Sequence, residues 1–138
     1  MSREKEIITD EKYNSMCKKL GDILINENFD YIFGVQRGGL PIAVYLSHYL
    51  NVDMNNDIDF CSYGKKRKLN ILVVDDIVDT GLTINKLKGY FYIFENIQIK
   101  YASLFLRSNC DYKPDYYIEL TDKWVVFPWE KLDEKQNR

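Results

Sequence analysis

Apolar and polar positions follow two different periods along the chain. From Asp10 to residue 24 the apolar side chains recur every three or four residues, which predicts a helix with Asp10 as its N-cap. Gly21 falls inside this pattern and is expected to weaken the helix without ending it. A second helix is predicted from Pro41 to Leu50, because proline is accepted in the first turn of a helix. The apolar face of the first helix consists of Tyr13, Met16, Cys17, Leu20 and Leu24.

Continuous apolar runs predict the strands. Residues 71–74 form the strongest run, and their branched side chains predict a strand that is buried on both faces. Residues 31–35 form a shorter run, and apolar and polar residues alternate from Ile97 before an apolar run that ends at Leu106. A helix is expected to begin near Thr83. Weaker strand candidates are residues 58–61, 116–118 and 125–127.

Strands that alternate with helices predict an α/β fold with a mainly parallel central sheet and helices on both faces. The length of 138 residues suits one domain, which we expect at residues 1–130, followed by a polar tail at residues 131–138. Ligands of such sheets bind beyond the carboxyl ends of the strands. The loops to inspect therefore follow Val35, Cys61, Val74 and Leu106.

Composition excludes several classes of function. Lys and Arg number 19 against 21 Asp and Glu, a net charge of −2 that argues against a general nucleic-acid binder. Cys17, Cys61 and Cys110 have no CxxC spacing, so neither a disulfide framework nor a zinc site is expected, and reduced thiols suit a cytoplasmic protein. The first ten residues lack the apolar core of a signal peptide. The most apolar run, residues 40–50, is too short to span a bilayer.

The richest candidate chemistry lies at residues 73–83, Val-Val-Asp-Asp-Ile-Val-Asp-Thr-Gly-Leu-Thr. The adjacent carboxylates Asp75 and Asp76 repel each other, and a vicinal diol or a hydrated Mg²⁺ would satisfy them. Residues 80–83 offer converging backbone N–H groups, two hydroxyls and a helix N-terminus, which together suit a phosphate. A diol site and a phosphate site so close together indicate a cradle for ribose 5-phosphate. The simpler alternative is that the acids cap the strand and Thr83 caps the helix.

Two other acidic motifs do not fit this segment. A receiver domain needs a phospho-acceptor Asp one strand later, and none follows here. A haloacid-dehalogenase motif needs carboxylates two positions apart, whereas Asp76 and Asp79 are three apart.

The segment instead resembles the phosphoribosyl-pyrophosphate (PRPP) signature of type I phosphoribosyltransferases: an apolar strand, two acids, two apolar residues, Asp-Thr-Gly, any residue and Thr. The resemblance extends from about Glu6 to Glu130 and is closest to the small bacterial xanthine–guanine phosphoribosyltransferases. It implies a single-domain type I phosphoribosyltransferase-like fold. It also implies that Asp75 and Asp76 hold the ribose hydroxyls and Mg²⁺, with Asp76 as the metal ligand, directly or through water. By the same resemblance Asp79 is the catalytic proton acceptor, and the 5-phosphate site is Asp79, Thr80, Gly81, Leu82 and Thr83.

Two further loops resemble parts of this family. The first is similar to its pyrophosphate loop and comprises Gln36, Arg37 and Gly38, with Gln36 in place of the expected small residue. The second occupies the place of the catalytic lid but is much shorter than in most relatives. A solvated charged hairpin is the alternative interpretation of this second loop. Its candidate residues are Ser62, Tyr63, Lys65, Lys66 and Arg67.

The C-terminal third resembles the base pocket of the xanthine–guanine enzymes. Arg107 matches the cation that reaches the six-position oxygen of the purine, a position where Lys is usual. Trp124 matches the ring that covers the base, and Val125 matches the residue whose backbone reads its two-position edge. Without the preceding motifs, Trp124 would be interpreted as a half-buried core indole. Trp129, next to Pro128, is expected to be a packing residue.

The resemblance implies Mg²⁺-dependent transfer of the 5-phosphoribosyl group from PRPP to a 6-oxopurine, with a nucleoside 5′-monophosphate and pyrophosphate as products. Guanine, hypoxanthine and xanthine remain equal candidates, and the role would be purine salvage. A homodimer or homotetramer in the cytoplasm, with no nucleic-acid partner and no membrane span, completes this expectation. The alternative is a PRPP-binding regulatory or non-catalytic protein with the same cradle.

Overall fold

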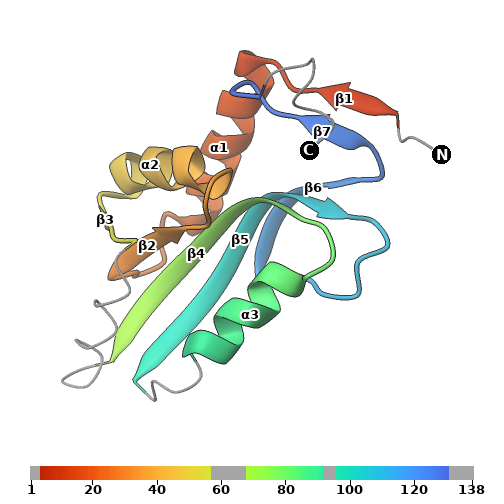
Figure 1. Cartoon of the computed structure of the whole chain (residues 1–138). Helices are drawn as coiled ribbons and strands as arrows, with labels where there is room; N and C mark the ends of the chain where they lie inside the picture. The colour runs from red at the N-terminus through yellow and green to blue at the C-terminus, as the bar shows by residue number, and fades with distance from the viewer. Residues whose placement is uncertain (1–3, 57–67, 92–95, 131–138) are drawn as a thin grey trace.

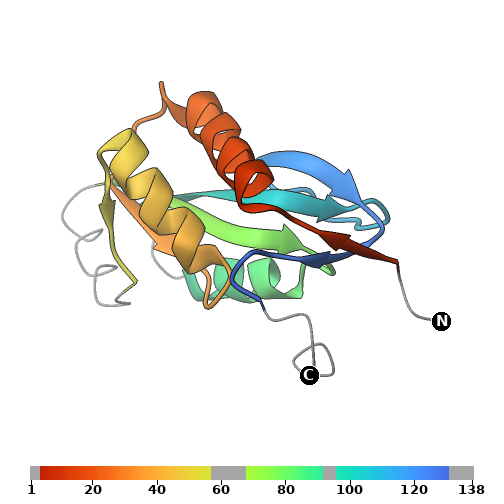
Figure 2. The same cartoon turned by 90° about the horizontal axis from the view of Figure 1, so that it is seen from above.

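The fold is a three-layer α/β arrangement in a computed structural model that describes residues 4–56, 68–91 and 96–130. A five-stranded sheet has the order β3-β2-β4-β5-β6, and all of its neighbouring strands are parallel. Helices α1 and α2 cover one face of this sheet and α3 covers the other (Figures 1 and 2). The elements are β1 (Lys5–Ile7), α1 (Asp10–Leu24), β2 (Tyr31–Gly34), α2 (Gly39–Leu50), β3 (Asp53–Met54), β4 (Leu69–Val78), α3 (Leu82–Phe91), β5 (Ile97–Arg107), β6 (Tyr116–Thr121) and β7 (Trp124–Val126).

A second, two-stranded sheet joins the two ends of the described chain. Strand β1 pairs with β7 in parallel, with Glu6 opposite Val125. This small sheet lies near the carboxyl end of β5, as Figure 1 shows. No helix in the described part of the chain is long and apolar enough to cross a membrane.

The core has two halves that β4 separates. Leu72 and Val74 belong to the half beneath α1 and α2, whereas Ile71 and Val73 belong to the half beneath α3. All four side chains are almost completely buried, which confirms the expectation that this strand is covered on both faces. The predicted apolar face of α1 is also confirmed, since all five of its residues are buried.

Two local details differ from the sequence expectations. Thr9, not Asp10, is the N-cap of α1, because the Thr9 hydroxyl accepts a hydrogen bond from the Lys12 N–H at 3.1 Å. Asp10 is instead the first helical residue, where the helix dipole favours an acid. Strand β4 does not end at Val74 but continues to Val78, because β5 remains paired with it over this stretch. The acidic pair therefore lies within the strand and not in the turn. The candidate strand at 58–61 and the tail at 131–138 fall outside the described residues.

The connection from β2 to α2 lies directly against β4. Val35 and Val74 are joined by a backbone hydrogen bond of 2.9 Å, and the Gly39 N–H donates to the Val35 carbonyl at 2.8 Å. A Cβ atom on Gly39 would lie 2.2 Å from the Val74 carbonyl oxygen. Helix α2 can therefore begin at this height above the sheet only because position 39 lacks a side chain.

We predict that Gly39→Ala lowers the free energy of unfolding by about 1–3 kcal/mol, the usual cost of overpacking, because the obstacle is backbone that cannot rotate away. Gly89→Ala is the matched control, since an added Cβ there meets nothing within 4 Å. In the control, loss of the flexibility of glycine within a helix is expected to raise stability by up to about 1 kcal/mol. Urea unfolding of both variants measures the difference, and equal effects at the two positions would contradict this account of Gly39.

Candidate active site

The predicted pyrophosphate loop and the acidic pair are in direct contact. Gly34, the last residue of β2, lies opposite Val74, so the loop that follows β2 lies beside the part of β4 that carries Asp75 and Asp76. A Cβ on Gly38 would lie 2.0 Å from Oδ2 of Asp76. Gln36 and Arg37 are exposed in the same turn and are joined by a cis peptide bond. Groups predicted to bind ribose and pyrophosphate are thus adjacent.

The acidic pair is partly held by its own backbone. Oδ1 of Asp75 accepts from the Asp76 N–H, and Oδ1 of Asp76 accepts from the Ile77 N–H, each at 2.8 Å. Burial of the Asp75 carboxyl, reinforced by the neighbouring Asp76 carboxyl, raises the pKa of Asp75 well above its ordinary value. Two carboxyl groups this close together favour the binding of a cation or of a hydroxyl group that donates a hydrogen bond.

The donor set of this pair fits Mg²⁺ only in company with a ligand. No group of three or more His, Cys, Asp or Glu side chains within the described ranges could hold a metal by itself. Mg²⁺ is usually held by one or two carboxylates together with water and substrate phosphates, and does not need a complete protein cage. Asp75 and Asp76 provide the carboxylate part of such a site.

The turn after β4 encloses a small hollow. Its volume is about 80 Å³, and its lining consists of Asp75 and residues 77–84. Gly81 has a φ of 84°, a left-handed conformation that favours glycine, and it brings the chain into α3. Leu82 is 64% exposed and lies in the lining of this hollow. The Leu82 N–H donates to the Thr80 hydroxyl oxygen at 3.3 Å, and N–H groups of a first helical turn that lack an intrahelical partner are suitable donors to an anion.

A buried guanidinium connects this turn to the start of β7. Arg107, at the end of β5, is only 5% exposed. Its Nε donates to Oδ1 of Asp79 at 3.2 Å, and its Nη1 donates to the carbonyl oxygen of Lys123. The predicted proton acceptor and the predicted base-binding cation are therefore an ion pair. Because Trp124 follows Lys123 directly, Arg107 connects the predicted base-binding residues to the turn after β4, which is the predicted phosphate site and is called the phosphate turn below.

The two tryptophans have different surroundings. Trp124 is 42% exposed and belongs to neither cluster of the described core, whereas Val125 beside it is buried. Trp129 is about as exposed, at 40%, but it stacks on Phe127, with ring centroids 4.9 Å apart, and meets Tyr13 edge to face. The surroundings of Trp129 are those expected of a packing residue. Trp124 has the exposed face that a stacking role would need.

Sequence reasoning missed two residues beside this site. The Asn56 side chain accepts from the Gly34 N–H at 2.9 Å and donates to the Gly34 carbonyl at 2.7 Å, so it holds the end of β2 as a neighbouring strand would. Tyr112 lies against Gly81, where an added Cβ would be 3.0 Å from the Cβ of Tyr112. A polar residue in a loop leaves no periodic signal, so only the structure reveals the role of Asn56. The lid candidates Ser62, Tyr63, Lys65, Lys66 and Arg67 lie outside the described residues.

Comparison with known proteins agrees with this geometry. The hypoxanthine-guanine phosphoribosyltransferase of Bacillus subtilis (strain 168) is 28% identical over 148 residues, which cover 89% of this chain and 82% of that protein. The crystal structure of a purine phosphoribosyltransferase from Pyrococcus horikoshii OT3 has a TM-score of 0.79 and 29% identity, and the match covers 93% of this chain and 95% of that one.

A third relative agrees in fold alone. The xanthine-guanine-hypoxanthine phosphoribosyltransferase of Helicobacter pylori has a TM-score of 0.77 at 22% identity, with 97% of this chain and 98% of that chain covered. The family described as phosphoribosyl transferase domain matches residues 63–134, slightly more than half of the sequence. This chain belongs to the phosphoribosyl transferase domain family.

Proposed function

We propose that this protein transfers the 5-phosphoribosyl group of PRPP to a 6-oxopurine base, with Mg²⁺, and releases pyrophosphate and a nucleoside 5′-monophosphate. The observation that carries the proposal is the contact between Gly38 and Asp76 beside the phosphate turn. It puts groups suited to pyrophosphate, ribose hydroxyls and a 5-phosphate next to one another in the order in which PRPP carries them. The purine substrates named for the B. subtilis and P. horikoshii relatives support the choice of base.

PRPP would be held mainly by charge and by backbone donors. The carboxylates of Asp75 and Asp76 accept hydrogen bonds from the vicinal ribose hydroxyls. Backbone N–H groups at residues 80–83 hold the 5-phosphate, and Arg37 neutralises part of the pyrophosphate charge. When bound, Mg²⁺ would supply positive charge that stabilises the leaving pyrophosphate, with Asp76 as its protein ligand, directly or through water.

The purine base would be held and deprotonated on the side of the ribose that faces away from the pyrophosphate. The transition state resembles an oxocarbenium ion, so positioning and charge stabilisation provide most of the catalysis. Asp79 accepts the proton from the ring nitrogen at position seven. Arg107 orients this carboxylate through Nε, and it retains further N–H donors for the six-position oxygen, because two of its five N–H groups make the contacts described above. Trp124 covers the face of the base, and the Val125 backbone reads its two-position edge.

The direct test is incubation of the protein with PRPP, Mg²⁺ and one base at a time. We expect a nucleoside 5′-monophosphate with at least one of guanine, hypoxanthine and xanthine, and none when Mg²⁺ is removed by chelation. Product with adenine or orotate alone would contradict the assignment of the base. Binding of PRPP without release of pyrophosphate, whichever base is present, would indicate the regulatory alternative.

The carboxylates are expected to separate by role. Asp79→Asn should lower turnover by about 10²-fold or more, the scale for a positioned acid–base group, and leave the affinity for PRPP nearly intact. Asp75→Asn and Asp76→Asn should instead weaken binding of PRPP and Mg²⁺, because they remove charge from the diol and metal site. Calorimetric titration with PRPP and steady-state kinetics of the three variants provide the comparison. Equal loss of PRPP affinity in all three would refute this division.

Trp124 and Trp129 form a matched pair for the base site. Trp124→Ala should weaken the apparent affinity for the base by a factor equivalent to about 1–3 kcal/mol, the scale for base–aromatic stacking, while Trp124→Phe retains most of it. Trp129→Ala should mainly lower the melting temperature, because it removes ring packing on Phe127 and Tyr13. Melting curves and both Michaelis constants distinguish the two. A large loss of stability in Trp124→Ala with unchanged base affinity would make Trp124 a core residue.

A further inference from the structure

The strand that carries Trp124 and Val125 is not part of the large sheet. Within the described residues, β7 is hydrogen-bonded to β1, and these two strands form a sheet of their own. The Trp124 N–H donates to the Glu4 carbonyl at 2.8 Å, and the Ile8 N–H donates to the Val126 carbonyl at 2.9 Å. The position of the candidate base site therefore depends on where β1 is held.

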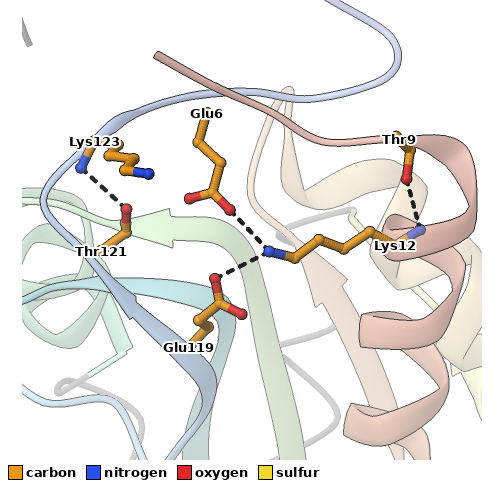
Figure 3. A network of polar contacts seen from close by, with 6 residues as sticks. All are labelled: Glu6, Thr9, Lys12, Glu119, Thr121 and Lys123. Carbon is orange, nitrogen blue, oxygen red and sulfur yellow. Dashed lines mark hydrogen bonds and ion pairs between the residues drawn. The ribbon is translucent and has the colours of Figure 1, made fainter. Parts of the chain in front are cut away.

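Lys12 connects β1 to the large sheet. Its ammonium lies 2.8 Å from Oε2 of Glu6, in β1, and 3.2 Å from Oε2 of Glu119, in β6 (Figure 3). Thr9 fixes the backbone of Lys12 through the N-cap hydrogen bond, so the lysine extends from a stable first turn of α1. One side chain thus joins three elements: a helix, a strand of the small sheet and the edge strand of the large sheet.

Glu6 and Glu119 can lie this close together because the positive charge of the Lys12 ammonium lies between them. The hydrogen bond with Glu6 is the main cause of the raised pKa of Lys12, with a further contribution from Glu119, while burial acts in the opposite direction. Without the ammonium, two carboxylates would face each other across the gap between β1 and β6 and would repel. The three side chains are 38%, 22% and 40% exposed, so solvent weakens each pair and their contribution to global stability is small.

The other end of β7 has its own support. The Lys123 N–H donates to the Thr121 hydroxyl at 3.0 Å, as Figure 3 shows, and the Lys123 carbonyl accepts from Arg107. These contacts fix where the strand begins. Val125 and Phe127 also anchor this segment in the core beneath α1 and α2, and the pairing of Val125 with Glu6 connects it to β1.

We propose that Lys12 is a positioning residue for the base site. By joining Glu6 to Glu119, it holds β1 and therefore β7 at the height at which Trp124 and the Val125 backbone can contact a base. Lys12 itself touches no reacting group. The inference rests on the proposed function for its kinetic consequence, but the placement of β7 can be measured without any reaction.

Lys12→Met keeps the length of the side chain and removes its charge. We expect the KM for the 6-oxopurine to rise by about fivefold, the scale of one partly exposed ion pair, with kcat and the KM for PRPP within about twofold of wild type. Lys12→Arg should restore most of the base affinity, because it again reaches two carboxylates. The double variant Lys12→Met with Glu119→Gln should recover part of it, because it removes the repulsion.

Lys18→Met is the matched control on the same helix. Lys18 forms an ion pair with Asp22 at 3.0 Å within α1 and connects no strand. This variant should leave both Michaelis constants unchanged. Equal rises in the two Michaelis constants of Lys12→Met, or the same effect in Lys18→Met, would overturn the proposal and make Lys12 a general structural residue.

A fluorescence measurement separates this proposal from the proposed function. In a Trp129→Phe background Trp124 is the sole tryptophan, and acrylamide quenching reports its exposure. Quenching should change in Lys12→Met and not in Lys18→Met. Unchanged quenching in Lys12→Met overturns the positioning role whatever the activity. Changed quenching in a protein whose wild type makes no nucleotide supports the placement of β7 by Lys12 and refutes the proposed function alone.

Discussion

The contact of the β2–α2 connection with β4 is the constraint on which the rest of the site depends. Gly39 lies against the Val74 carbonyl and Gly38 lies against the Asp76 carboxylate, and neither approach leaves room for a Cβ. Because α2 begins at this point, the positive end of its dipole lies close to Asp76. The same close approach therefore has two effects. It packs the start of α2 directly on the sheet, and it brings the positive end of the helix dipole, which favours negative groups, next to the two carboxylates.

Arg107 extends this arrangement to the base side. A guanidinium is a planar group with several N–H donors in fixed directions, so it can hold Asp79 and the Lys123 carbonyl together. A lysine ammonium at the same position is a compact point charge and lacks this fixed fork. The structure thus gives a physical reason for an arginine at the position where the resemblance leads us to expect lysine: here the cation also joins the turn after β4 to the start of β7. Arg107 is buried and Asp79 is half-exposed, so Asp79 supplies the negative charge that compensates the buried guanidinium while solvent weakens the pair.

The sequence predicted the architecture well because its signals are periodic or local. The apolar stripe of α1 and the branched run in β4 follow directly from burial on one face or two, and the acidic motif indicated the site from consecutive residues. The features that the sequence did not predict depend on contacts between segments that are distant along the chain. The end of β4 depends on pairing with β5, and the two bonds of Asn56 to Gly34 join residues 22 positions apart. Likewise, the residue types at 79 and 107 indicated charge at both positions but not that the two side chains form a pair.

The site is built on two sheets that are stabilised in different ways. The groups proposed to bind PRPP lie on the large sheet, and its central strand β4 belongs to both halves of the core, so the core sets the spacing of Asp75, Asp76 and the turn after β4. The groups proposed to bind the base lie on β7, which reaches that core through Val125 and the following Phe127 and is also connected to the polar contacts of Arg107 and Lys12. Polar contacts at a partly exposed junction can be rearranged at small cost to folding, whereas the core cannot. If β7 carries the base site as proposed, we therefore expect changes at Lys12 and Glu119 to alter affinity for the base without disturbing the carboxylates and backbone donors of the large sheet.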